Sequence, residues 1–142
     1  MRFWDSSGIV ALLVEEPATE AARRLFAEDG DAVVWGQTPL EVLAALWRRR
    51  RRGQLDEAGR AAAEAALRNL EGVWSVVLDL DPVEDRARRI LAVHPIRAVE
   101  AAQLAAALVA CEDRCDLLPF VTFDEGLGEA ARREGFSVLP RG

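Results

Sequence analysis

Four acidic residues stand at positions from which an alternating strand and helix chain can bring them together. Asp5 directly follows the apolar segment RFW, and Asp124 directly follows FVTF. Glu41 lies in the first turn of the helix expected after the second strand, and Glu100 in the first turn of the helix before the fourth. In open parallel sheets, ligands bind beyond the carboxyl ends of the strands. We therefore expect the four carboxylates to converge on one edge of a sheet.

Four carboxylates in one cleft repel one another unless something neutralises them. Two like charges about 4 Å apart cost roughly 4 kcal/mol at an effective dielectric of about 20. All 18 basic residues are arginine, and the nearest obvious one is Arg97. A divalent cation is the simplest remedy, and all-oxygen ligands suit Mg²⁺ or Mn²⁺ better than zinc or copper. Such a metal activates water and stabilises charge on phosphoryl oxygen, which indicates phosphoester hydrolysis. Ser6 and Thr122 are candidates to hydrogen-bond a ligand acid or a metal-bound water.

Each acid also has a purely structural interpretation. Asp5 and Asp124 could cap the helices that follow them. Glu41 comes three residues after Thr38, which is the spacing of a capping box. Glu100 in a first helical turn would complement the helix dipole. The joint interpretation is favoured because four unrelated caps would otherwise share one sheet edge by accident.

Short apolar strands alternate with helical patterns along the whole chain. Strands are expected at 2–4, 32–35, 74–78, 119–123 and 136–139. Helices are expected to begin at Ser6 or Ser7 and to run over 18–28, from 38 to the break at Gly53, and over 56–70, 81–93, 97–111 and 124–134. Such alternation predicts a parallel sheet covered on both faces, in a three-layer α/β/α architecture. The length fits one domain spanning 1–142.

Four segments together resemble the PIN-domain nucleases, in particular the VapC-type toxins of bacterial toxin–antitoxin pairs. They are FWDSSGIVALLVEE, TPLEVLAAL, HPIRAVEAAQLAAAL and PFVTFDEGLGEAARREGF, and they span nearly the whole chain. The resemblance implies a central five-stranded parallel sheet and an Mg²⁺- or Mn²⁺-dependent endoribonuclease. It also implies a homodimer that acts on RNA and is inhibited by a small DNA-binding antitoxin.

The resemblance assigns the catalytic and metal-binding acids to Asp5, Glu41, Glu100 and Asp124, the hydroxyl after the first acid to Ser6, and the threonine of the T-x-D motif to Thr122. One position departs from the family pattern, because the third acid is usually aspartate and here is Glu100. The side chain is longer by one C–C bond, about 1.5 Å. Since Mg²⁺ tolerates little deviation from octahedral geometry, we expect a shifted backbone, an intervening water or a preference for Mn²⁺.

The rest of the sequence narrows the alternatives. No apolar run approaches the roughly 20 residues that span a bilayer, and the N-terminal segment lacks the pattern of a secretory signal, so a cytoplasmic protein is expected. The absence of lysine argues against phosphatases and receiver domains that use one, and no G-K-[ST] motif of a P-loop exists. The remaining alternative is a PIN-like module that binds RNA or protein with little or no cleavage.

The arginine run, the histidine and the cysteines have open or structural interpretations. Arg48 to Arg52 end a helix, where cations complement the dipole, but they could also bind RNA phosphates. The net charge of −6 does not decide between these. His94, which precedes a proline, is interpreted as structural. Cys111 and Cys115 are interpreted as reduced thiols.

Overall fold

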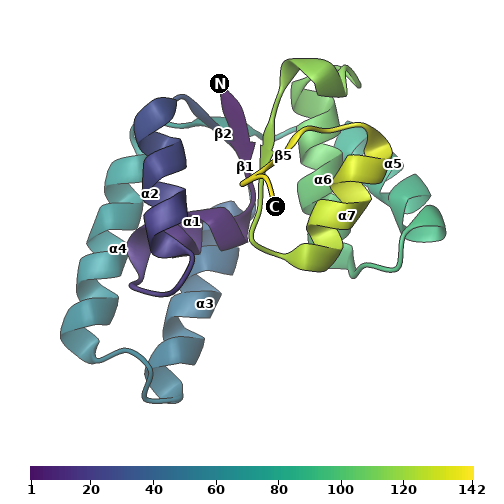
Figure 1. Ribbon diagram of the computed structural model, residues 1–142. Coiled ribbons are helices and arrows are strands. Elements are labelled where there is room, and N and C mark those ends of the chain that lie inside the picture. The colour runs from purple at the N-terminus through teal and green to yellow at the C-terminus, as the bar shows by residue number, and fades with distance from the viewer.

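The computed structural model describes residues 1–142 and contains a sheet of five parallel strands (Figure 1). The strands are β1 (Arg2–Trp4), β2 (Ala32–Trp35), β3 (Ser75–Val77), β4 (Phe120–Val121) and β5 (Val138–Leu139). Their order in the sheet is β3-β2-β1-β4-β5, and every neighbouring pair is parallel. The strand that ends at Asp5 is therefore the central one, between the strand before Glu41 and the strand before Asp124.

Helices cover both faces of the sheet, and Figure 1 shows them as two separate groups. One group comprises α1 (Ser6–Leu13), α2 (Thr19–Glu28), α3 (Thr38–Arg51) and α4 (Glu57–Glu71). The other comprises α5 (Leu80–Val93), α6 (Ala98–Ala110) and α7 (Glu125–Glu134), with a short 3-10 turn, η1 (Cys115–Leu117), that was not predicted. The predicted three-layer α/β/α architecture is confirmed. No helix combines the length and apolar character needed to cross a membrane.

The strands are apolar on both faces because each face has its own core. Trp4 and Val34 pack with α1–α4, whereas Phe3, Val33 and Phe120 pack with α5–α7. Successive residues of a strand point to opposite faces, so three or four residues are enough to contribute to both cores. The rings of Phe3 and Phe120 stack with centroids 5.3 Å apart. This packing fixes the height at which β1 and β4 end, and with it the positions of Asp5 and Asp124.

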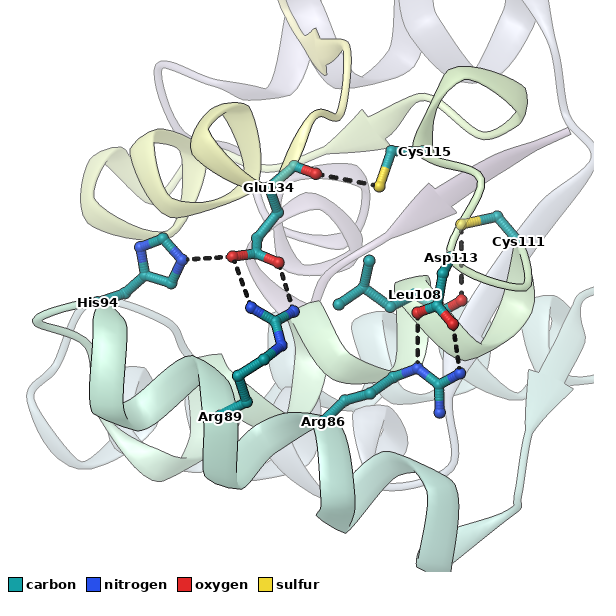
Figure 2. A network of polar contacts seen from close by, with 8 residues as sticks. All are labelled: Arg86, Arg89, His94, Leu108, Cys111, Asp113, Cys115 and Glu134. Carbon is teal, nitrogen blue, oxygen red and sulfur yellow. Dashed lines mark hydrogen bonds and ion pairs between the residues drawn. The ribbon is translucent and has the colours of Figure 1, made fainter.

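An ion-pair network joins α5 to α7 and to the loop after α6 (Figure 2). We call it the α5–α7 network; it comprises Arg86, Arg89, His94, Asp113 and Glu134. The Arg86 guanidinium donates to both carboxylate oxygens of Asp113, at 2.8 and 2.7 Å. Arg89 donates to both oxygens of Glu134, at 3.2 and 2.6 Å. Nε2 of the buried His94 lies 2.7 Å from Glu134 Oε2, as expected of a structural histidine.

Both cysteines are free thiols, as predicted. The Cys115 thiol donates to the Glu134 carbonyl oxygen beside the network. Burial raises the pKa of both thiols, that of Cys111 to about 11. The cysteines therefore pack as small, protonated side chains.

Candidate functional site

Asp5 ends the central strand and begins the next helix. Its Oδ1 accepts from the Gly8 amide at 2.9 Å and from the Ser7 hydroxyl at 2.7 Å, while Oδ2 accepts from the Thr122 hydroxyl at 2.8 Å. Gly8 lets the helix approach the sheet, since a Cβ there would lie 3.0 Å from the Trp4 ring. Asp5 therefore caps α1 as predicted, but the cap uses only one of its two carboxylate oxygens. No cation pairs with Asp5, which is 2% exposed.

Burial raises the pKa of Asp5 to about 6, although its three hydrogen bonds oppose the rise. The nearby charge of Asp124 raises it further. A buried carboxylate whose donors are all neutral is costly to ionise, because desolvation disfavours the charged form. A cation bound beside Asp5 would therefore stabilise its ionised form strongly.

Glu41 projects from the first turn of α3 and is half-buried. Its carboxylate accepts from the Gln103 side-chain amide at 3.0 Å and from the Ser6 hydroxyl at 3.2 Å. Desolvation raises the pKa of Glu41 to about 7, and the charges of Asp5 and Glu100 contribute to the rise. Like Asp5, Glu41 has only neutral donors.

The capping box expected between Thr38 and Glu41 is not formed. Thr38 is itself the first helical residue, Gln37 occupies the cap position, and no side chain caps the helix. The Thr38 hydroxyl instead accepts from the Gln103 amide at 3.1 Å. Because helix capping does not require the Glu41 carboxylate, it is free to face the other acids.

Asp124 follows the sheet and caps α7. Its Oδ1 accepts from the Leu127 amide at 2.8 Å, and its own amide donates to the Thr122 hydroxyl at 3.0 Å. Thr122 thereby contacts both acids that end strands, since its hydroxyl also donates to Asp5. The second carboxylate oxygen of Asp124 makes no hydrogen bond, so one oxygen remains available to a ligand.

Glu100 is held differently from the other three. Its carboxylate accepts from the Arg97 backbone amide at 3.1 Å and from the Arg97 guanidinium at 2.8 and 3.1 Å. Partial burial raises the pKa of Glu100, but these hydrogen bonds outweigh it and hold the pKa below its ordinary value. As the side chains lie, no group of three or more acidic, histidine or cysteine side chains is close enough to hold a metal ion.

Two residues at the site were not predicted. The hydroxyl that contacts Asp5 belongs to Ser7, which also accepts from the Phe123 amide at 2.9 Å, whereas Ser6 contacts Glu41. Gln103 links α6 to α3 through Glu41 and Thr38, and its Oε1 is buried without a hydrogen-bond partner. Gln103 lies one helical turn after Glu100, and this spacing was the available signal for it.

A cleft of about 480 Å³ opens over Glu41 and Ser7. Its walls are α1, α3, the start of α6 and Phe123; the charged side chains that line it are Glu16, Glu41, Arg48, Arg49 and Arg97. A smaller cavity of about 230 Å³, which Phe123 also lines, contains Thr122 and Asp124 in its wall. Glu41 lines the larger cleft and Asp124 the smaller cavity, whereas the buried Asp5 lines neither.

The donors at this edge suit a hard divalent cation. They are carboxylate, hydroxyl and amide oxygens, and no thiol or imidazole lies among them, since His94 belongs to the α5–α7 network. Two oxygens, Asp124 Oδ2 and Gln103 Oε1, have no partner. Mg²⁺ and Mn²⁺ prefer such oxygen ligands. The chemistry of these oxygen ligands therefore fits such ions, and the acidic side chains would have to move closer together to hold one.

Comparisons with known proteins agree with the architecture. The family model described as PIN domain matches residues 2–133, a range that contains all four acids. A solved structure from Mycobacterium tuberculosis, the sarcin-ricin loop cleaving toxin VapC20, is similar in fold, with a TM-score of 0.67 and 23% identity over 96% of each chain. No curated protein sequence matches the chain. The resemblance seen in the sequence is confirmed, and the chain belongs to the PIN domain family.

Proposed function

We propose that the protein is an Mg²⁺- or Mn²⁺-dependent endoribonuclease that uses Asp5, Glu41 and Asp124, with Glu100 at the outer edge of the site. One observation carries the proposal. Asp5 and Glu41 are carboxylates with raised pKa values and no positively charged partner, at the edge of the sheet where parallel strands end. Because ionising them without a counter-charge is unfavourable, binding a divalent cation would stabilise the site.

In this proposal Asp5, Glu41 and Asp124 hold the ion through their carboxylates. When bound, the ion supplies an activated water and stabilises negative charge on a phosphoryl oxygen. Ser7 and Thr122 fix the orientation of the Asp5 carboxylate, and Ser6 and Gln103 fix that of Glu41. The unpartnered Gln103 Oε1 is placed to accept from a water at the site.

Glu100 would join the site by exchanging the Arg97 guanidinium for the ion. Arg97 is 83% exposed at its side chain, so the exchange releases it to solvent at little cost. The longer reach of glutamate, compared with the aspartate usual in the family, allows the side chain to reach Arg97 in one rotamer and the acids in another.

The biological setting we propose is that of a toxin with an RNA substrate, a cognate antitoxin protein and a homodimeric assembly. The likeness to the toxin VapC20 supports the RNA substrate and the antitoxin partner. The homodimer is supported by apolar side chains exposed along the edge strand β3 and its flanks, namely Val73, Val76, Leu78 and Leu80. A short reading frame directly upstream of the gene would support the pairing with an antitoxin.

The test is cleavage of RNA by the purified protein in Mn²⁺, with and without EDTA, beside an Asp5→Asn variant. We expect cleavage that EDTA and the substitution each abolish. Cleavage that survives both would refute the metal-dependent mechanism. RNA binding with no cleavage under any condition would instead favour the non-cleaving PIN-like module.

A further inference from the structure

Arginines without a carboxylate partner are few in this molecule. Thirteen of the 18 arginines form an ion pair with an aspartate or glutamate. The five that remain are Arg48, Arg51, Arg52, Arg114 and Arg141. Only Arg48 among these lines the cleft over Glu41.

The other two cations of the cleft are already committed. Arg49 donates to Glu16 at 3.1 Å and to the Ala45 carbonyl at 3.3 Å. Arg97 is held by Glu100. The Arg48 side chain has neither a hydrogen bond nor an ion pair, so its guanidinium is the one cation in the cleft that is free to bind an external anion.

Arg48 also lies at a definite place relative to the acids. It follows Glu41 by seven residues in α3, which is two helical turns or about 10.5 Å along the axis, on the same face of the helix. Ala44 and Ala45 line the cleft between them, and their small side chains leave this stretch open. The Cα–Cβ bonds of a helix tilt toward its N-terminus, so the Arg48 side chain starts out in the direction of Glu41.

We propose that Arg48 binds a backbone phosphate of single-stranded RNA that neighbours the phosphate held at the acids. The inference rests on the proposed function and adds the path of the substrate, which runs along α3 from Glu41 toward Arg48. A guanidinium binds phosphate with two parallel N–H donors, which gives position as well as affinity. Arg48 is therefore a positioning residue.

The experiment measures binding apart from cleavage. Fluorescence anisotropy would follow a labelled oligouridylate titrated with the protein over a series of salt concentrations, with Ca²⁺ replacing Mg²⁺ to slow hydrolysis. For Arg48→Gln we expect affinity about tenfold weaker at low salt. The slope of log affinity against log salt should shrink by about 0.7, the value for one phosphate contact on a single strand.

Two matched variants control for charge and for shape. Arg114→Gln removes the same charge from another exposed, unpaired arginine that does not line the cleft, and it should leave the affinity and the slope unchanged. Arg48→Lys keeps the charge but loses the two-donor geometry, and it should recover the slope but only part of the affinity.

Three results would overturn the inference: no binding of the oligouridylate by the wild type, equal losses in Arg48→Gln and Arg114→Gln, or an unchanged slope in Arg48→Gln. Failure of the proposed function would look different. Wild-type protein that binds the RNA through Arg48 but never cleaves it supports this inference and removes the nuclease activity. If the wild type cleaves RNA but Arg48→Gln binds it with unchanged affinity, the nuclease activity is supported and the role of Arg48 is refuted.

Discussion

Carboxylates in two regions of the molecule are neutralised in opposite ways. In the α5–α7 network, Asp113 and Glu134 each face an arginine fork, and these hydrogen bonds lower the pKa of both acids (Figure 2). At the carboxyl edge of the sheet, Asp5 and Glu41 receive only hydroxyl, amide and backbone donors, and burial raises their pKa values. Arginines of the chain therefore pair with the acids of the α5–α7 network, whereas no arginine pairs with Asp5 or Glu41.

The difference distinguishes structural from functional acids. A carboxylate paired with arginine stabilises the native state without any added component. A buried carboxylate left without a cation costs stability when it ionises, and the cost is recovered only when an external cation binds. Arginine is abundant in this chain, so the lack of an arginine paired with Asp5 or Glu41 reflects the placement of those acids. The two regions should therefore respond with opposite sign to the same type of substitution.

The largest expected effect is that of Asp5→Asn. Cleavage of RNA should fall more than a hundredfold, beyond the ten- to hundredfold loss typical of residues that only orient a metal ligand. Without metal, the variant should be more stable than the wild type at about pH 8, by about 3 kcal/mol or less, because it removes a charge that the folded state buries. Chemical denaturation checks the second point, and a destabilised variant would contradict it.

Next in size is Glu134→Gln in the α5–α7 network. Its side chain is 11% exposed, and the change weakens the interactions of both Arg89 and His94. We expect a loss of about 1.5–3 kcal/mol in the free energy of unfolding, as for hydrogen bonds to charged groups. Cleavage measured well below the melting temperature should not change. A stabilised variant, or one with lost activity, would show that the two regions do not differ as described.

The pH dependence of the wild type should report the unneutralised acids. Asp5 and Glu41 have raised pKa values of about 6 and about 7, so the folded state binds more protons than the unfolded chain above the ordinary carboxyl range. The two acids lower the free energy of unfolding least below about pH 4, where both are protonated. That stability is lost as the pH rises through their pKa values in the folded state. Without metal, thermal stability should therefore fall between about pH 5 and about pH 8.

Added Mg²⁺ should reverse that fall, and more so at about pH 8 than at about pH 5, because only the ionised acids bind it. Calorimetric melting curves with and without the ion measure both effects. The Asp5→Asn variant is the control and should show a smaller response. A metal-induced shift that is equal at both pH values would contradict the assignment.

The smallest expected effect is that of Arg97→Met, which frees Glu100 from its ion pair. If Glu100 is a ligand, Mn²⁺ should bind a few-fold more tightly to the variant, since the exposed pair contributes at most about 1 kcal/mol. Isothermal titration calorimetry measures this, with Glu100→Gln as the matched control. Unchanged affinity in both variants would remove Glu100 from the ion-binding set.

The fold could be predicted from the sequence because its local signals agree with one another. The strand Ala32–Trp35 has the predicted bounds, being a continuous apolar run between a turn and a helix start. The 3-10 turn at Cys115–Leu117 was missed because it has no periodicity and follows two residues with positive φ, Glu112 and Asp113. The order of the strands in the sheet was not predicted, since strand spacing alone does not determine it.

The positions of two of the acids in the fold were predictable, but the hydrogen-bond partners of the acids were not. Asp5 and Asp124 were located by the strand ends, which the sheet geometry fixes. Whether Ser6 or Ser7 reaches Asp5 depends on the rotation of the first turn of α1, which two adjacent serines do not reveal. The capping box was predicted at Glu41, but its Glu-to-backbone hydrogen bond forms at Glu100, because α3 begins one residue earlier than the spacing from Thr38 requires.

The separation of the helices into two groups has a mechanical consequence (Figure 1). Glu41 belongs to α3 on one face of the sheet, whereas Glu100 and Asp124 belong to α6 and α7 on the other. An ion bound by these acids would cross-link the two helical layers at the carboxyl edge of the sheet. Hydrogen exchange should then slow on both faces at once when the ion binds, and loosening of either layer should release the ion before the sheet itself comes apart.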